Sequence, residues 1–120
     1  FVALGFPRPV EIPVMKLSFQ IAQKLHAVSG EGSDRAHDLI DLQLIHNHST
    51  LDFSDIKSKC IRLFDYRREQ PWPPAVVKGS TWDAVYSEAR ATLADASQIL
   101  SNVDAAVNWV NDLIAKIDKA

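Results

Sequence analysis

The apolar residues of this chain recur with the period of an α-helix. The first apolar stripe repeats at intervals of three and four residues: Leu17, Ile21, Leu25 and Val28. This spacing places side chains on one face of a helix, whereas a half-buried strand would alternate at every second residue. Similar stripes follow along the rest of the chain. We therefore expect a mainly α, bundle-like domain of four to five helices with little strand.

Glycine, proline and polar residues separate the expected helices. Ser18 is the expected N-cap of the first helix, and the glycines within residues 30–32 end it. A second helix is expected to start at Ser33 or Asp34, either of which can serve as its cap. Further helices are expected over residues 54–66, 81–93 and 103–117, with a short helical turn over 95–100. The Gln-Pro-Trp-Pro-Pro sequence at residues 70–74 predicts a stiff loop.

Three prolines fall within the first 16 residues, at positions 7, 9 and 13. Proline has no N–H group to donate, so it is unsuited to a helix interior or an inner strand. Residues 1–16 are therefore expected to form an extended connector, with at most a short edge strand around residues 10–15. A helical domain is expected over residues 17–120. Because the sequence opens with Phe1 inside this stretch, we interpret the connector as the end of an upstream domain.

Composition excludes several classes of protein. A length of 120 residues suits one domain. The formal net charge of −2 is not that of a general nucleic-acid binder. Cys60 is the only cysteine, which rules out an internal disulfide and a cysteine-based metal site. The apolar runs are too short to span a membrane. We expect a cytoplasmic protein with no membrane partner and no metal site in this chain.

Lys24 lies inside the apolar stripe of the first expected helix. Successive helical residues are about 100° apart, so Lys24 projects within roughly 20° of Leu17. An unpaired buried ammonium costs free energy, so an acidic partner is expected. Asp38 faces the apolar side of the next helix, and Asp41 lies one i+3 step further on. The short link between the helices favours antiparallel neighbours, which would let Lys24 approach Asp38.

Spacing alone leaves two interpretations of this pair open. The first is a structural ion pair that is buried between two helices. The second is a triphosphate site, in which Lys24 contacts phosphate and an aspartate positions or deprotonates the attacking group.

Two short motifs around these residues resemble the AbiEii-type nucleotidyltransferase toxins. The Gln-Lys-Leu-His-Ala sequence at residues 23–27 is similar to the Lys-Leu-x-Ala helix of that family. The Arg-Ala-His-Asp-Leu-Ile-Asp-Leu sequence at residues 35–42 is similar to Arg-x-Lys-Asp-Leu-x-Asp-Leu on the following helix. The stretch from Pro9 to Ile45 resembles the same family. The proline-rich loop and the Trp-x-x-x-Tyr helix after it resemble one branch of the family.

The resemblance implies a role for each matched residue. The matching lysine is thought to contact the phosphates of the nucleotide, which makes Lys24 a candidate nucleotide-binding and catalytic residue. The first aspartate of the second motif is essential in the family, which makes Asp38 a catalytic candidate. Arg35 is a further nucleotide-binding candidate, and Asp41 is a further catalytic candidate. His37 stands where the family has a lysine.

The resemblance also implies partners and a wider architecture. Related toxins are similar to polymerase-β-type transferases; they use a nucleoside triphosphate, and some modify the acceptor end of tRNA. A cognate antitoxin and Mg²⁺ are implied for the full-length protein. The family's metal-binding motif is Gly-Ser followed by Asp-x-Asp, and the nearest match, Gly79-Ser80, is followed by Asp83 alone. An N-cap at Ser80 or Thr81 is the simpler interpretation of that segment.

We therefore expect the C-terminal helical part of an α+β nucleotidyltransferase, which would hold no metal and be inactive alone. The metal-binding motif would lie upstream of Phe1. The alternative is a helical protein-interaction module without catalysis.

Residues 57–68 carry a local positive charge. They contain five basic residues and one acidic residue: Lys57, Lys59, Arg62, Arg67 and Arg68, with Asp65. One interpretation is an RNA-binding surface in which Arg67 and Arg68 contact phosphates and Trp72 stacks on a base. The other is a solvated helix face, with Trp72 packed against the core beside its prolines.

Overall fold

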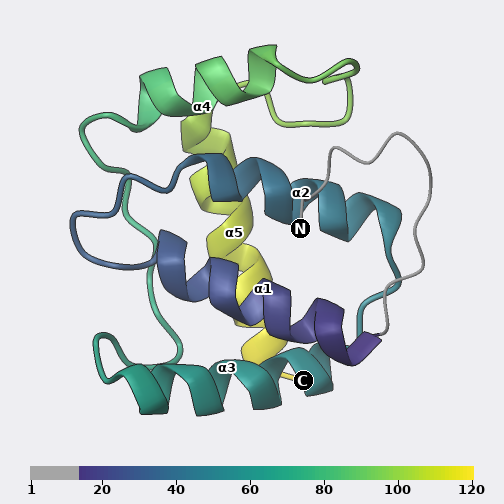
Figure 1. Ribbon diagram of the computed structural model, residues 1–120, viewed down its shortest axis with the longest axis vertical. Helices are drawn as coiled ribbons and strands as arrows, with labels where there is room; N and C mark the ends of the chain where they lie inside the picture. Colours follow the sequence, from purple (N-terminus) through teal and green to yellow (C-terminus); the bar gives the residue numbers. More distant parts are fainter. Residues whose placement is uncertain (1–13) are drawn as a thin grey trace.

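A computed structural model describes residues 14–120, within which the chain forms five α-helices and no strand. The helices are α1 (Val14–Val28), α2 (His37–His48), α3 (Phe53–Arg67), α4 (Trp82–Ala91) and α5 (Val103–Asp118). Figure 1 shows α4, α2, α1 and α3 side by side in this order, with α5 crossing behind them. The mainly α fold predicted from periodicity is confirmed.

The first helix begins earlier than its apolar stripe predicted. It starts at Val14, three residues before the expected start at Leu17. Ser18 is therefore not the N-cap; it lies buried in the second turn of the helix. The predicted edge strand around residues 10–15 falls partly outside the described residues, and Val14 and Met15 are helical.

The second helix begins later than predicted, because Ser33 does not cap it. The Ser33 hydroxyl donates a hydrogen bond to the Ala27 carbonyl (2.8 Å) and accepts one from the Arg35 N–H (3.1 Å). These bonds order the link between the two helices, and α2 starts at His37. Gly32 has φ +68° in this link, a left-handed conformation that favours glycine.

The later helices lie close to their predicted positions. The Asp52 side chain accepts a hydrogen bond from the Asp55 N–H at the start of α3, and Asn102 caps α5 in the same way through Ala105. The expected cap of α4 is absent, because Thr81 makes no side-chain capping bond. Over residues 95–100, where a short helical turn was expected, the chain makes a turn in which the Ile99 N–H donates to the Ala96 carbonyl (3.0 Å).

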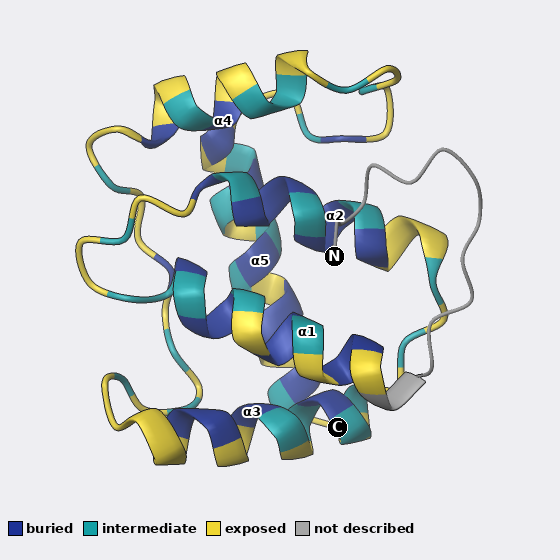
Figure 2. Ribbon diagram, in the orientation of Figure 1, coloured by how far each residue is buried: buried dark blue, intermediate teal, exposed yellow. Residues whose placement is uncertain are grey.

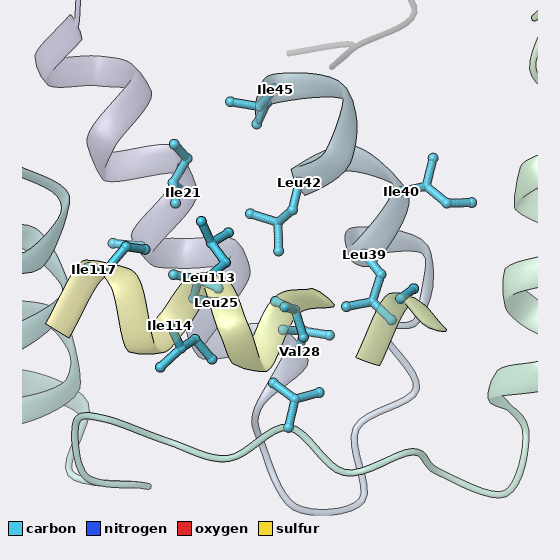
Figure 3. Packing of buried hydrophobic residues seen from close by; sticks show 14 of the residues in the cluster. Ile21, Leu25, Val28, Leu39, Ile40, Leu42, Ile45, Leu113, Ile114 and Ile117 are labelled. Carbon is cyan, nitrogen blue, oxygen red and sulfur yellow. The ribbon is translucent and has the colours of Figure 1, made fainter. Parts of the chain in front are cut away.

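The core lies where α1, α2 and α5 meet. Figure 3 shows the side chains of Leu25, Leu42 and Leu113 converging from these three helices. The buried positions follow the helical period and face inward (Figure 2). From α4, Trp82 and Tyr86 complete the core with almost no exposed area.

A buried polar side chain that the periodicity did not predict joins α2 to α4. The Gln43 Nε2 group donates to the Tyr86 hydroxyl (3.0 Å), and the Gln43 Oε1 atom accepts the Leu100 N–H (2.9 Å). Tyr86 in turn donates to the Leu100 carbonyl (2.7 Å). These partners satisfy a buried amide that would otherwise cost free energy.

The long loop between α3 and α4 is attached to α5 by side chains. The Trp72 indole N–H donates to the Asp118 carboxylate (3.0 Å). The Asn111 side chain makes two hydrogen bonds to the backbone of Val76, at 2.8 Å to the N–H and 3.0 Å to the carbonyl. The loop therefore follows the surface in a fixed path although it contains no helix.

Candidate functional site

The helices α1 and α2 run antiparallel, as the short link between them predicted (Figure 1). The Lys24 ammonium lies between two carboxylates of α2, 3.2 Å from Asp38 Oδ1 and 2.8 Å from Asp41 Oδ2. Side-chain exposure is 18% for Lys24, 1% for Asp38 and 21% for Asp41. The predicted contact between Lys24 and Asp38 is present, and Asp41 is a second partner of the same ammonium.

The two carboxylates keep the Lys24 ammonium charged. Burial alone would lower the pKa of Lys24, but the hydrogen bond to Asp41 and the charges of Asp38 and Asp41 outweigh it. The pKa of Lys24 is therefore raised above its ordinary value. Near neutral pH, Lys24 is a fixed positive charge at the seam of α1 and α2.

The side chains of Arg35 and His37 lie next to the buried Asp38 carboxylate. Arg35 Nε lies 3.2 Å from Asp38 Oδ2, and His37 Nε2 lies 3.5 Å from Asp38 Oδ1. Asp38 Oδ2 accepts no hydrogen bond from the described residues, so the contribution from Arg35 is a charge at close range. Arg35 thus joins the cluster although it precedes α2 and lies in the link.

A pocket of about 270 Å³ opens beside this cluster. Four residues of α1 line it at helical spacing, and two residues come from the link and α2: Gln20, Gln23, Lys24, Ala27, Arg35 and Asp38. The Arg35 side chain is 48% exposed, so its guanidinium reaches solvent at the pocket. Besides the Asp38 carboxylate, the lining offers two cations and two amide groups, which are donors that can bind a phosphate or carboxylate.

Gln20 and Gln23 were not among the predicted site residues. Their signal is the 3, 4 and 7 spacing of residues 20, 23, 24 and 27, which puts both amides on the face that carries Lys24. Amides are common on solvated helix faces, so this spacing would not by itself have indicated a site.

The described residues do not fit a divalent metal ion. No group of three His, Cys, Asp or Glu side chains within residues 14–120 is arranged to hold one. Asp38 and Asp41 face Lys24 and Arg35, whose positive charges would repel a metal ion from these carboxylates.

The three residues predicted to bind RNA do not form one surface. Arg68 and Trp72 line a hollow of about 640 Å³ that also contains Asp65 and Glu69. The Trp72 indole N–H is bonded to Asp118, and its ring packs edge-on against Phe64 with centroids 5.4 Å apart.

Arg67 lines a different hollow, between α1 and α3. The RNA-binding role therefore stays a prediction for these residues, and the geometry separates Arg67 from Arg68 and Trp72.

No helix within residues 14–120 has both the length and the apolar character that crossing a membrane requires.

Comparison with known proteins gives a family for the chain. The profile of the family described as "Nucleotidyl transferase AbiEii toxin, Type IV TA system" matches residues 2–115. No curated protein matches the chain. The match covers the Lys24 helix, the Asp38 helix and nearly all of the domain around them. The chain therefore belongs to the AbiEii family of nucleotidyl transferase toxins from type IV toxin–antitoxin systems.

Proposed function

We propose that the pocket between α1 and α2 holds the phosphates of a nucleoside triphosphate during nucleotidyl transfer by this toxin. The observation that supports the proposal is the Lys24 ammonium, fixed by two carboxylates on the wall of a solvent-open pocket beside Arg35. A cation that is already held in position before the ligand arrives loses little conformational freedom when the ligand binds.

The cations can contact phosphate without leaving their carboxylates. An ammonium has three N–H donors, and Lys24 gives hydrogen bonds to one oxygen each of Asp38 and Asp41. The third N–H is left for a phosphate oxygen. Arg35 approaches Asp38 through Nε, which leaves its two terminal nitrogens for a second oxygen.

The two aspartates differ in exposure, which supports different roles. Asp38 is almost fully buried, so it acts by holding Lys24 and Arg35 in position. Asp41 keeps a fifth of its side chain exposed and lies 2.8 Å from the Lys24 ammonium, which lines the pocket. We assign Asp41 the role of orienting or deprotonating the attacking group.

The finer parts of the proposal rest on the family. They are an RNA acceptor such as tRNA, a cognate antitoxin as partner, and Mg²⁺ in the complete catalytic centre. The printed sequence contains no Asp-x-Asp motif, and the described residues do not fit a metal. We therefore assign no step to a metal and propose that this chain binds the nucleotide without transferring it.

Titration of the chain with ATP, GTP, CTP and UTP by isothermal calorimetry tests the proposal. We expect at least one of the four to bind, and Lys24→Met to weaken that binding by tenfold or more. Lys78→Met is the matched control, because the Lys78 ammonium also lies between two carboxylates, 3.3 Å from Asp83 and 3.1 Å from Asp104. The control should bind as the unchanged protein does.

Either of two results would make the proposal wrong. One is that none of the four triphosphates binds the unchanged chain. The other is that Lys78→Met weakens binding as much as Lys24→Met, which would show that the loss is not specific to this pocket.

The alternative is an interaction module in which Lys24 and Asp38 only stabilise the fold. The near-complete burial of Asp38 favours it. It predicts that Lys24→Met lowers the melting temperature measured by circular dichroism and leaves triphosphate titrations unchanged.

A further inference from the structure

A second hollow lies between α1 and α3. It encloses about 540 Å³. We call it the α1–α3 groove and define it by the side chains used below: Phe19, Gln23, Lys59, Arg62, Tyr66 and Arg67. Figure 1 shows that α1 and α3 lie side by side along their lengths.

Two aromatic rings of this groove face solvent. Tyr66 is 84% exposed and Phe19 is 44% exposed, whereas Phe64, Trp82 and Tyr86 are buried. The exposed part of each ring is not covered by the described part of the domain, so it is available to pack against a ligand.

The groove is also positively charged in an acidic chain. Lys59, Arg62 and Arg67 line it, and no acidic side chain from residues 14–120 does. The Lys59 ammonium is paired with Asp55 at 3.0 Å, so Arg62 and Arg67 supply most of the available charge. Lys59, Arg62 and Tyr66 follow each other at three and four residues, which places them on one face of α3.

Exposed aromatic rings lie beside two guanidinium groups that form no ion pair within the described part of the chain. This combination suits a ligand with flat bases and regularly spaced negative charges. We propose that the α1–α3 groove binds a single-stranded nucleic acid, with bases stacked on Tyr66 and Phe19 and phosphates at Arg62 and Arg67. An acidic protein segment would use the arginines and leave the aromatic faces without a matching surface.

The groove fits this ligand better than the hollow at Arg68 and Trp72. There the carboxylates of Asp65 and Glu69 would repel phosphates, and the Trp72 ring is packed on Phe64.

Gln23 lines both the groove and the pocket beside Lys24. A nucleic-acid strand bound in the groove would thus lie next to a nucleotide bound at Lys24, with α1 contributing to both sites. That this nucleic acid is the acceptor of nucleotidyl transfer rests on the proposed function, whereas the binding of a nucleic-acid strand in the groove does not.

Fluorescence anisotropy with labelled 12-nucleotide RNA and DNA strands, and with an RNA duplex, tests the proposal on the full chain. We expect the single strands to bind more tightly than the duplex. Tyr66→Ala should weaken single-strand binding about tenfold, because one stacked base is lost. Arg62→Gln with Arg67→Gln should weaken binding and reduce the slope of log affinity against log salt by about 1.4, roughly 0.7 for each lost phosphate contact.

The control is Arg68→Asn, which removes the neighbouring positive charge outside the groove. Asparagine tolerates the left-handed conformation of Arg68, which has φ 55°. This variant should keep at least half of the affinity. The ratio of RNA to DNA affinity then identifies which single strand the groove prefers.

Three outcomes would overturn the proposal: no binding of any strand at low salt, full affinity in Tyr66→Ala, or displacement of the strand by polyglutamate at equal charge concentration. Displacement of that kind would assign the surface to an acidic protein. Lys24→Met separates this proposal from the nucleotide pocket, because it should leave strand binding unchanged while triphosphate binding is lost.

Discussion

At the scale of single residues, the Asp38 carboxylate dominates the energetics of the α1–α2 seam. Its side chain is almost fully buried, so the charges of Lys24 and Arg35 must compensate for its lost hydration. Removing one member of a buried ion pair leaves the other charge buried without a partner, whereas removing all members together leaves no such charge. Because Lys24 also bonds Asp41, the loss of Asp38 alone leaves the ammonium paired.

Variants of these three residues should therefore show non-additive stabilities. We expect Asp38→Ala with Asp41→Ala to lower the free energy of unfolding by about 3 kcal/mol or more, because Lys24 is left without a partner. Adding Lys24→Met should recover part of this loss. Urea unfolding monitored by circular dichroism measures both values. A triple variant no more stable than the double variant would contradict this account of the seam.

Part of this site was predictable from the sequence, and the rest was not, for physical reasons. Lys24 and Asp38 were predictable because each breaks the apolar period of its own helix. Gln43 also lies on the apolar side of α2, four residues after Leu39. Its role was not predictable, because its partner Tyr86 is 43 residues away and only the packing of α4 brings the two together.

At the scale of helices, the boundaries depended on where capping side chains actually bond. The expected and observed limits of α3 and α5 differ by at most one residue at each end, since Asp52 and Asn102 make the capping bonds that helix starts require. The start of α2 was misplaced by three or four residues because the Ser33 hydroxyl bonds backward to Ala27. The residue type shows that a side chain is able to cap a helix, but its other contacts in the fold decide whether it does.

The start of α4 depends on a close approach rather than on a cap. The Trp82 indole N–H donates to the Ser33 carbonyl at 2.7 Å, across the link between α1 and α2. A Cβ atom at Gly79 would lie 2.8 Å from Trp82 Nε1 and 3.2 Å from the Ser33 oxygen. A glycine at position 79 therefore allows α4 to dock on this link.

We expect Gly79→Ala to destabilise the protein by about 1–3 kcal/mol, because the added methyl group displaces Trp82 from its hydrogen bond. Gly30→Ala is the control, since its Cβ would meet only backbone oxygens at 3.7 and 4.0 Å. The control should change stability by less than about 1 kcal/mol. Thermal and urea unfolding of both variants provide the comparison, and equal effects would exclude the proposed close contact.

At the scale of the whole molecule, His26 lies where α1, α3 and the long loop meet. Its ring packs edge-on against Phe64 at 4.9 Å, and its carbonyl accepts a hydrogen bond from Gln70 at 2.8 Å. Burial lowers the pKa of His26, the nearby Arg67 lowers it further, and Glu69 opposes this in part. The neutral ring is thus favoured in the folded state.

Stability should consequently fall under mild acid. The contribution of His26 is complete above its ordinary pKa of about 6.5 and is lost as the pH falls from there through the lowered folded pKa. We expect the free energy of unfolding to decrease from pH 8 to pH 5 more steeply in the unchanged protein than in His26→Gln. Parallel pH profiles for the two proteins would show that His26 titrates without linkage to folding.

The position of α5 has a consequence for how the protein is made. This helix contacts α2, α3 and α4 from behind, and it is the last of the five in chain order (Figure 1). While a ribosome is still extending the chain, the apolar side chains of α2, α3 and α4 that pack on α5 have no cover. The nascent protein is therefore exposed to chaperones and proteases until residues 103–118 emerge.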